Sequence, residues 1–375
     1  MNAQNIDQKN FVYLDGYRGI LALFVAISHS KTNNSRCELV DFIRSRHNHG
    51  LNGFFVLSAF LLTYHLIIDF KNTSKPIFFS TLKYFIKRLF RIYLVYFIVV
   101  TSISFGPKIL GGPYEYSSWF DIISLKNTGS SHLWTMPIEI KYYFFIPIFS
   151  FIFARFEKYK LIILPISIFF TELDRRFNWM AKPDEIVFEK GHLLRVRFSI
   201  FFYGTIAAFT LHTIESYEKL INVIQNHRMV QILINLLSVV LIVYLVRFTH
   251  TFDHSSLTAV AMYWSIIILS MTLGHPNLLT NIFSNEFLRS CGKFSFGIYL
   301  LHPIFVQTSI NLKLTKLQID LTFSVIIKSY LASYLFFYII EKNCMNLGNL
   351  CIKQIEKFFL SRNKIMNQEE NSLPK

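Results

Sequence analysis

The sequence predicts an all-α fold, a polytopic membrane bundle of about ten transmembrane helices with both termini in the cytoplasm. Hydrophobic residues fill 52% of the 375 positions and charged residues only 16%, well below the roughly 25% of ordinary soluble domains. The apolar residues gather in runs that approach the about 20 helical residues needed to cross a bilayer core. Lys and Arg are divided unequally between the loops that separate these runs. These three observations predict a multi-pass membrane protein.

Ten candidate spans can be placed in order along the chain. The seventh (MVQILINLLSVVLIVYLV) and the tenth (LTFSVIIKSYLASYLFFYII) are clear from length alone. The first and fifth are weaker, because their uninterrupted apolar cores at 20–27 and 161–170 are short. The spans lie approximately at 12–30, 51–69, 89–106, 133–154, 159–171, 196–212, 229–247, 256–273, 292–310 and 319–340.

The charge of the loops predicts the orientation. The loops on the side of both termini hold more Lys and Arg than the other loops, which places the termini in the cytoplasm. The margin is narrow, mainly because the loop at 171–197 puts several bases outside, where acidic residues offset them. No small-residue cleavage site follows the first apolar run, so we expect the first span to be retained.

The chain has no internal repeat and no low-complexity linker, so residues 1–341 are expected to form one membrane domain. Residues 342–375 would then form a cytoplasmic tail. In this tail Ile352, Ile355 and Phe359 share one helical face among lysines. That pattern is typical of an amphipathic helix on the anionic cytoplasmic leaflet, and a solvated tail is an equally good interpretation.

The composition also excludes other classes. The net charge is +15, but the bases are scattered between apolar runs, so nucleic acid is not an expected partner. The many aromatic residues exclude a disordered chain. The four cysteines form no CxxC pair, which argues against a disulfide scaffold or a zinc site. No metal is expected at a group without regular ligand spacing, namely Glu38, Asp41, His47 and His49.

Ionisable residues inside spans indicate function, because they are costly there. Arg18 and His29 lie 11 positions apart, which returns them to one helical face with a rise of about 16 Å between them. With Arg18 at the cytoplasmic edge, His29 would lie deep in the bilayer. The alternative is that Arg18 is a positive-inside anchor and that His29 marks the outer end of the helix.

Basic residues also gather where the chain enters the third span. Arg88 and Arg91 are three positions apart and share a helical face, where two guanidinium groups can converge on a phosphate. Lys83 and Lys87 lie one turn earlier. The group suits the phosphates of a nucleotide such as coenzyme A, although clustered bases at a cytoplasmic helix end also follow from topology alone.

Two further segments carry polar groups. Glu139 lies on roughly the same face as Tyr142 and Tyr143, where it could orient a histidine or bind an acceptor hydroxyl. Tyr299 and His302 are also neighbours on one face, and Pro303 interrupts the hydrogen bonds of that helix. An isolated interfacial histidine is the alternative interpretation of His302.

Taken in order, these segments resemble acyltransferase family 3, the multi-pass membrane acyltransferases that include O-antigen, exopolysaccharide and Nod-factor acetylases. Each motif is weak alone, but their order over residues 14–341 is specific. Three residues differ from the family pattern. Ala59 stands where the family usually has Gly, Ile140 stands in place of the second Glu of its motif, and Asn343 stands in place of a Pro. The first motif is LDGYRG, which contains Arg18 and is followed by His29, 11 positions after that arginine. The other motifs are NGFFVLSAFLL, Arg88-x-x-Arg91, HLWTMPIEIKYYFFIP, FSFGIYLLHP and Glu341 at the end of the last span.

The resemblance implies an enzyme that moves an acyl group, commonly acetyl, from cytosolic acyl-CoA to a hydroxyl of a carbohydrate or glycolipid. The histidine of the first span would act as general base or as acyl carrier, and the sequence leaves both open. The expected residues are His29, Arg18 and Glu139 for catalysis, Arg88 and Arg91 for the acyl-CoA phosphates, and Tyr142, Tyr299 and His302 for orienting the substrate or the base.

Two other classes of protein stay open at this point. A transporter or lipid flippase would also use charges inside the membrane, but it often shows paired half-repeats, which this sequence lacks. A catalytically inactive relative serving as a receptor or scaffold would be marked by loss of Arg18 or His29, and both are present. A bacterial inner membrane and a eukaryotic membrane both fit, and the sequence indicates no oligomeric state.

Overall fold

The regular elements of the protein are helices throughout the residues that the computed structural model describes. These residues are 11–30, 38–72, 76–105, 119–126, 131–177, 179–180, 194–248, 254–274, 276–311 and 318–372. The longer helices are α1 (Val12–His29), α3 (His47–Lys71), α4 (Ile77–Arg88), α5 (Leu94–Phe105), α8 (Phe145–Arg155), α9 (Lys160–Phe177), α10 (Leu194–Glu215), α12 (Arg228–Phe248), α13 (His254–Leu273), α16 (Ser295–Asn311), α17 (Gln318–Phe336) and α18 (Lys342–Ser372). The shorter elements are α2 (Glu38–Arg44), η1 (Leu89–Tyr93), α6 (Trp119–Ile123), η4 (Ser131–Trp134), α7 (Thr135–Tyr143), η5 (Glu157–Tyr159), α11 (Glu218–Asn226), α14 (Leu278–Phe283), α15 (Glu286–Lys293) and η7 (Phe337–Glu341).

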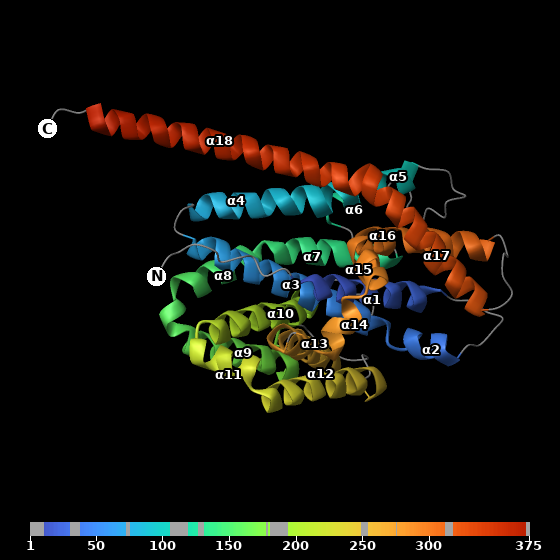
Figure 1. Cartoon of the computed structure of the whole chain (residues 1–375). Coiled ribbons are helices and arrows are strands. Elements are labelled where there is room, and N and C mark those ends of the chain that lie inside the picture. Colours follow the sequence, from blue (N-terminus) through green and yellow to red (C-terminus); the bar gives the residue numbers. More distant parts are fainter. Residues whose placement is uncertain are drawn as a thin grey trace.

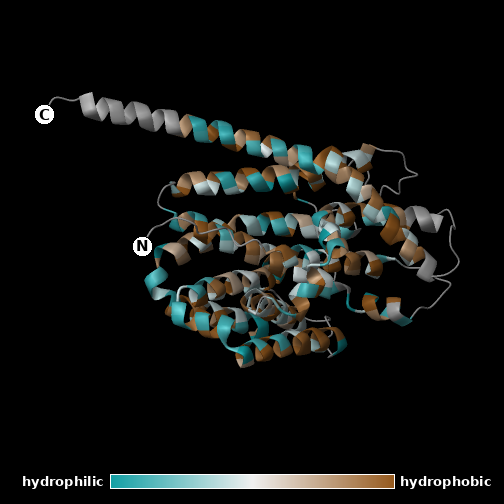
Figure 2. Cartoon of the chain, viewed as in Figure 1, coloured by the Kyte–Doolittle hydropathy of each residue, from teal (hydrophilic) through white to brown (hydrophobic). Residues whose placement is uncertain are grey.

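The surface of the bundle is apolar where lipid would surround it. In the described residues seven helices are long and apolar enough to cross a membrane, and Ser295–Val306 is a shorter apolar helix. On α12, Leu233, Leu236 and Val240 are exposed, and Figure 2 shows this helix largely in brown. Lipid stabilises such a surface, whereas water does not. The all-α polytopic class is therefore confirmed, while the count of ten spans and the cytoplasmic termini stay predictions.

Helix α1 lies inside the bundle, where α3, α15, α16 and α17 pack around it (Figure 1). Its buried face includes Leu14, Tyr17, Leu21 and Val25, each at most 2% exposed. Helix α3 is the second central element and packs against α10, α8 and α13. The first span, which is short in the sequence, is therefore stable because other helices cover it.

Small residues allow α1 to approach α14 and α15 closely. A Cβ atom on Gly16 would lie 1.8 Å from the carbonyl oxygen of Phe283, and a Cβ atom on Gly292 would lie 1.7 Å from that of Asp15. Gly19 meets the backbone of α15 in the same way. Close backbone packing of this kind is a common means of joining helices in membranes. It explains the two glycines of the LDGYRG segment.

Small residues also join α3 to α10. A Cβ atom on Gly204 would lie 2.2 Å from the carbonyl oxygen of Val56 and 2.9 Å from the Cβ atom of Ala59. Ala59 is completely buried. The departure of Ala59 from the family's usual Gly is tolerated because the facing residue is a glycine.

Two helices extend further than the predicted spans. The third span begins earlier than expected, since α4, η1 and α5 form one continuous helix from residue 77 to residue 105. The tenth continues through η7 into α18, which runs beside α4 and then beyond the body of the bundle (Figure 1). The predicted apolar face of the tail contacts α4, because Phe359 packs against Phe79 with ring centroids 5.9 Å apart and Ile352 is buried. In this structure α4 covers part of the face that we expected lipid or water to cover.

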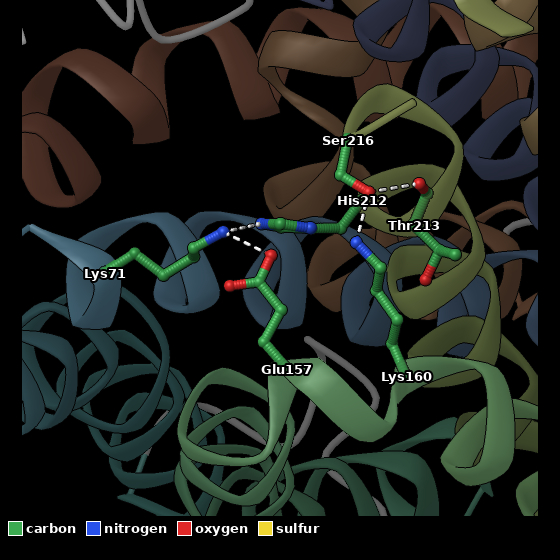
Figure 3. Close-up of polar contacts among 6 residues, drawn as sticks. All are labelled: Lys71, Glu157, Lys160, His212, Thr213 and Ser216. Atoms are coloured by element: carbon green, nitrogen blue, oxygen red, sulfur yellow. Dashed lines mark hydrogen bonds and ion pairs between the residues drawn. The ribbon is translucent and has the colours of Figure 1, made fainter. Parts of the chain in front are cut away.

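A polar cluster joins the end of α3, the turn η5, the start of α9 and the end of α10 (Figure 3). Lys71 Nζ donates hydrogen bonds to Glu157 Oε1 at 2.7 Å and to His212 Nε2 at 3.3 Å. Lys160 Nζ donates to Ser216 Oγ at 2.5 Å. Partial burial opposes ionisation of Glu157, but the hydrogen bond and charge of Lys71 outweigh it and hold the pKa of Glu157 below its ordinary value.

Candidate active site

Three histidines from distant parts of the chain meet at one place. His29 ends α1, His302 lies within α16, and His132 lies in η4. The ring centroids of His29 and His302 are 5.1 Å apart, and those of His132 and His302 are 5.2 Å apart. His302 is completely buried and His132 is 6% exposed. The structure thus brings together two of the predicted site residues, His29 and His302, and a third residue, His132, that was not predicted from the sequence.

The hydrogen bonds of His302 fix its neutral tautomer. Its Nδ1 atom lies 3.1 Å from the carbonyl oxygen of Ile298 and 2.9 Å from that of Tyr299. A carbonyl oxygen only accepts, so Nδ1 carries the hydrogen and Nε2 carries the lone pair. Pro303 has no N–H group for the carbonyl of Tyr299 four residues earlier, which leaves that carbonyl open to the imidazole. The His-Pro sequence therefore accounts for the orientation of the ring.

The same reasoning applies to His29. Its Nδ1 atom lies 3.0 Å from the carbonyl oxygen of Val25 and 3.2 Å from Nε2 of His302. Both neighbours accept, so Nδ1 of His29 is the donor and the neutral ring carries its lone pair on Nε2. His29 is therefore held in the tautomer that makes Nε2 the basic nitrogen.

Tyr299 connects the histidine cluster to α7. Thr135 Oγ1 and the Tyr299 hydroxyl are 2.5 Å apart, and that hydroxyl donates to the backbone carbonyl of His132. Since the phenol has a single hydrogen, Thr135 is the donor to Tyr299. The ring of Tyr299 also lies 5.3 Å from the ring of His132. Tyr299 thus fixes the position of η4 relative to α16.

A cavity of about 420 Å³ adjoins this cluster through Tyr299, and we refer to it as the first cavity. The three histidines are not among its lining residues. Its lining on α3 extends from Leu51 to Asp69, a distance of about 27 Å along the helix. Near Asp69 it is basic, and Lys83 lies 3.6 Å from that carboxylate. Thr135 and Tyr299 also line it, so it reaches the tyrosine that packs against His132 and His302.

The predicted phosphate-binding residues line the first cavity. Arg88 ends α4, Arg91 lies in the π-helical turn η1, and Arg18 comes from α1. Arg18 Nη1 lies 3.0 Å from Asp15 Oδ1. In the described structure Arg88 and Arg91 have no carboxylate at ion-pair distance, and Nε of Arg88 is buried without a hydrogen-bond partner there. Arg88 is partly buried and Arg91 is exposed, and two guanidinium groups without a carboxylate partner can bind a phosphate.

Glu139 also lines the first cavity, but its hydrogen bonds do not go to a histidine. Its Oε1 atom accepts from Ser58 Oγ at 2.8 Å and from Tyr143 Oη at 2.5 Å. Tyr142 lies on the far side, in the core, where its hydroxyl is 2.9 Å from Thr205 Oγ1. The pair next to the cavity is therefore Glu139 and Tyr143.

Three residues of this region were not predicted from the sequence. His132 and Thr135 stand in the HLWT segment, and Ser58 stands in the VLSA segment. Both segments belong to motifs that carried the family resemblance, which was the available signal. In the described residues no group of three His, Cys, Asp or Glu side chains could hold a metal ion.

A multi-helix membrane bundle has here a basic cavity lined by a tyrosine that packs against two buried histidines. Such an arrangement suits the class of membrane proteins that handle anionic, phosphate-bearing ligands. Comparison with known sequences identifies the family: the chain belongs to acyltransferase family 3, whose acyltransferase domain matches residues 11–341. This confirms the resemblance and the placement of the chain as a multi-pass membrane protein.

The chain is similar to the peptidoglycan O-acetyltransferase OatA of Listeria monocytogenes serovar 1/2a. The two are 24% identical over 359 residues, which cover 88% of this chain and 54% of the relative. The chain therefore spans about half the length of this curated relative. No solved structure matches the chain.

Proposed function

We propose that the protein transfers an acyl group, acetyl in the first instance, from cytosolic acyl-CoA to a hydroxyl group of a carbohydrate or glycolipid. Family membership supports acyl transfer, and the named activity of the relative supports O-acetylation of a cell-wall glycan. The observation that carries the proposal is the tautomer of His29, whose Nδ1 is bound to Val25 and His302 while Nε2 keeps its lone pair.

In the direct mechanism His29 Nε2 accepts the proton of the acceptor hydroxyl as its oxygen attacks the thioester carbonyl. The carbon–oxygen bond forms, the carbon–sulfur bond breaks, and the thiolate of coenzyme A takes the proton back from His29. His302 accepts from Nδ1 throughout and stabilises the positive charge that develops on His29, as an orienting group does in other acid–base pairs. Arg88 and Arg91 hold phosphates of the donor.

In the alternative mechanism His29 carries the acyl group. Nε2 attacks the thioester, the thiolate leaves, and the acyl-imidazole then passes its acyl group to the acceptor. This route would let the donor and the acceptor act from opposite sides of the membrane. Rapid quenching after addition of labelled acetyl-CoA without acceptor distinguishes the routes, because only the second labels the protein.

The acceptor site is proposed from the sequence. The sequence suggests the loop at 171–197 as the acceptor-facing surface, but most of it lies outside the described residues, which include Trp179 at its edge. Trp179 is exposed, and exposed aromatic rings suit sugars. A hydroxyl of a cell-wall glycan is the first acceptor to test, because the relative's name specifies peptidoglycan.

The test uses the purified protein in nanodiscs with radiolabelled acetyl-CoA and a panel of glycans. We expect label to move to the acceptor in the wild type, and the variant His29→Ala to lose transfer while keeping its thermal unfolding temperature. The control is His227→Ala, since His227 is an exposed histidine outside both the cluster and the cavity. Normal transfer by His29→Ala would contradict the mechanism, and no thioester consumption with any acceptor would favour a transporter.

A further inference from the structure

A second cavity adjoins the first. It measures about 710 Å³ and shares Arg18, Leu61, His65 and Arg91 with the first cavity. The shared residues lie on α1, on the middle of α3 and on η1. The two cavities therefore meet at Arg18 and at Arg91, and Arg91 is one of the two arginines to which we assign the donor's phosphates.

The second cavity is basic. Arg289 and Lys293 of α15 line it in addition to the shared arginines, and its acidic residues are Asp15 and Glu286. Asp15 already pairs with Arg18. In the described structure neither Arg289 nor Lys293 has a carboxylate at ion-pair distance. The cavity therefore keeps a surplus of positive charge.

The two bases of α15 are placed for a single phosphate group. Arg289 and Lys293 are four residues apart, so they share one helical face, with Cβ atoms about 6 Å apart. Gly292 on this helix packs against the backbone of Asp15, which sets α15 directly beside α1. Lys293 is held by Tyr338, whose hydroxyl oxygen lies 3.2 Å from Nζ, and its Nζ atom lies 4.9 Å from the ring centre of Phe337.

Aromatic rings complete the lining. Phe11 and Phe337 both face the second cavity, and flat apolar rings are suitable surfaces for a purine base. Two cationic side chains next to aromatic rings fit a phosphorylated nucleoside better than an isolated inorganic anion.

We infer that the second cavity binds the 3′-phosphorylated adenosine end of the acyl-CoA donor, with Arg289 and Lys293 contacting the 3′-phosphate. This inference rests on the proposed function. The donor has a diphosphate in its middle and a third phosphate on the ribose, at the end remote from the thioester. The thioester arm extends along the first cavity toward Tyr299, the diphosphate lies at Arg88 and Arg91, and the nucleoside enters the second cavity.

The first cavity offers a competing place for the 3′-phosphate at Lys83 and Lys87. Lys83 faces Asp69 at 3.6 Å, so part of its charge is already neutralised. Arg289 and Lys293 are not neutralised in this way in the described structure. The charge balance therefore favours α15 over α4 for the third phosphate.

The experiment measures binding of adenosine 3′,5′-bisphosphate and of adenosine 5′-monophosphate to the full chain in phosphatidylcholine nanodiscs. We expect the wild type to prefer the bisphosphate by about tenfold or more, as charged hydrogen bonds to phosphate provide. The double variant Arg289→Gln/Lys293→Gln should lose the preference while still binding the monophosphate. The charge-matched control Lys219→Gln/Lys353→Gln, at exposed positions outside both cavities, should keep it.

Three results would overturn the inference. The first is that the α15 variant keeps the preference, and the second is that Lys83→Gln/Lys87→Gln removes it instead. The third is that the α15 variant affects only binding of phosphatidylglycerol vesicles, which would assign these bases to a lipid headgroup. Arg289→Lys, which keeps the charge, should keep most of the preference and shows that loss in the double variant is not misfolding.

Transfer assays separate this inference from the proposed function. With acetyl-CoA the α15 variant should show a raised KM, and with acetyl-dephospho-CoA it should match the wild type. Normal transfer by the wild type without any preference for the bisphosphate would overturn the second-cavity site alone. Failure of the wild type both to bind the nucleotides and to consume acetyl-CoA would overturn the donor assignment together with the site.

Discussion

The Nδ1 atom of His29 lies 3.2 Å from the Nε2 atom of His302, although 273 positions separate the two residues in the chain. His302 can accept only because its own Nδ1 is bound to the carbonyl oxygens of Ile298 and Tyr299. The base of the proposed reaction is therefore positioned by a second histidine rather than by a carboxylate. This arrangement keeps negative charge out of a buried site, where it would be costly.

We predict that His302→Ala lowers kcat by about 10²- to 10⁴-fold, the range that positioned acid–base groups supply. Without His302, Nδ1 of His29 keeps only the carbonyl of Val25 as an acceptor, so the ring is held less firmly and Nε2 is less well placed to act as the base. The KM for acetyl-CoA should change little, because His302 does not line the first cavity. Transfer kinetics with saturating acceptor measure both constants.

The conservative variants show whether His302 acts through this hydrogen bond. His302→Gln offers an amide oxygen to His29 and should recover part of kcat. Pro303→Ala returns an N–H group that can compete with His302 for the carbonyl of Tyr299. Because the carbonyl of Ile298 still binds His302, the loss of kcat should be smaller than in His302→Ala. A similar kcat in His302→Ala and His302→Gln would show that the residue has only a packing role.

We predict that Arg88→Gln raises the KM for acetyl-CoA by about tenfold or more, because a charged hydrogen bond to phosphate is removed. The kcat should fall much less, since the proposed mechanism places the reacting thioester at the other end of the first cavity. Arg88→Lys should recover only part of the affinity, because an ammonium group cannot bind a phosphate through two parallel bonds. Arg228→Gln, at an exposed position at the start of α12, is the control. A fall of kcat by about tenfold in Arg88→Gln with an unchanged KM would contradict the phosphate role.

The histidine cluster could be predicted from the sequence only in part. Helical periodicity placed Arg18 and His29 on one face of α1, and the spacing of Tyr299 and His302 placed them on one face of α16. Helical periodicity could not predict that His29 meets His302 or that His132 lies beside them, because such contacts depend on how helices pack. His132 stands at the predicted start of a span, where a histidine is ordinary, so only the tertiary structure distinguishes it.

We predict that Gly292→Ala lowers the free energy of unfolding by about 1–3 kcal/mol, the usual cost of overpacking. The new methyl group would lie 1.7 Å from a backbone oxygen of α1, so α15 would have to move away. Gly50→Ala is the matched control, since its methyl group would lie 3.1 Å from a side-chain carbon of Val25, which can adjust. Thermal unfolding in detergent compares the two. An equal stability of both variants would contradict the close packing of α1 on α15.

Helix boundaries were predicted less well than helix positions, and the reason is physical. Lys83, Lys87 and Arg88 lower the hydropathy of α4, so a search for apolar runs begins the third span only at residue 89. The backbone hydrogen bonds of a helix do not depend on hydropathy, and the helix in fact begins at Ile77. For the same reason the charged residues after Glu341 do not end the last helix, which continues as α18.

We predict that the ion pair of Lys71 with Glu157 makes stability depend on pH. The pKa of Glu157 is lower in the folded protein than its ordinary value, so the pair stabilises the fold above the unfolded pKa of about 4.3. This contribution is lost as the pH falls through the lower folded pKa. Both side chains are about one-third exposed, so the contribution is about 0.5–1 kcal/mol. Unfolding curves of the wild type and Glu157→Gln should differ at pH 7 and converge at acidic pH. A difference between the two curves that stays the same at both pH values would contradict this prediction.

Tyr299 and Tyr142 were both predicted to orient the substrate or the base, and the structure gives them different surroundings. Tyr299→Phe removes the hydroxyl that joins Thr135 to the carbonyl of His132. We expect it to lower kcat by about tenfold or more, because η4 is no longer fixed beside His302. Tyr142→Phe removes a hydroxyl that contacts Thr205 in the core, so it should lower stability by about 1 kcal/mol and leave kcat nearly unchanged. Transfer kinetics and thermal unfolding of both variants check this contrast. A larger loss of kcat in Tyr142→Phe than in Tyr299→Phe would place the working tyrosine on α7 instead of α16.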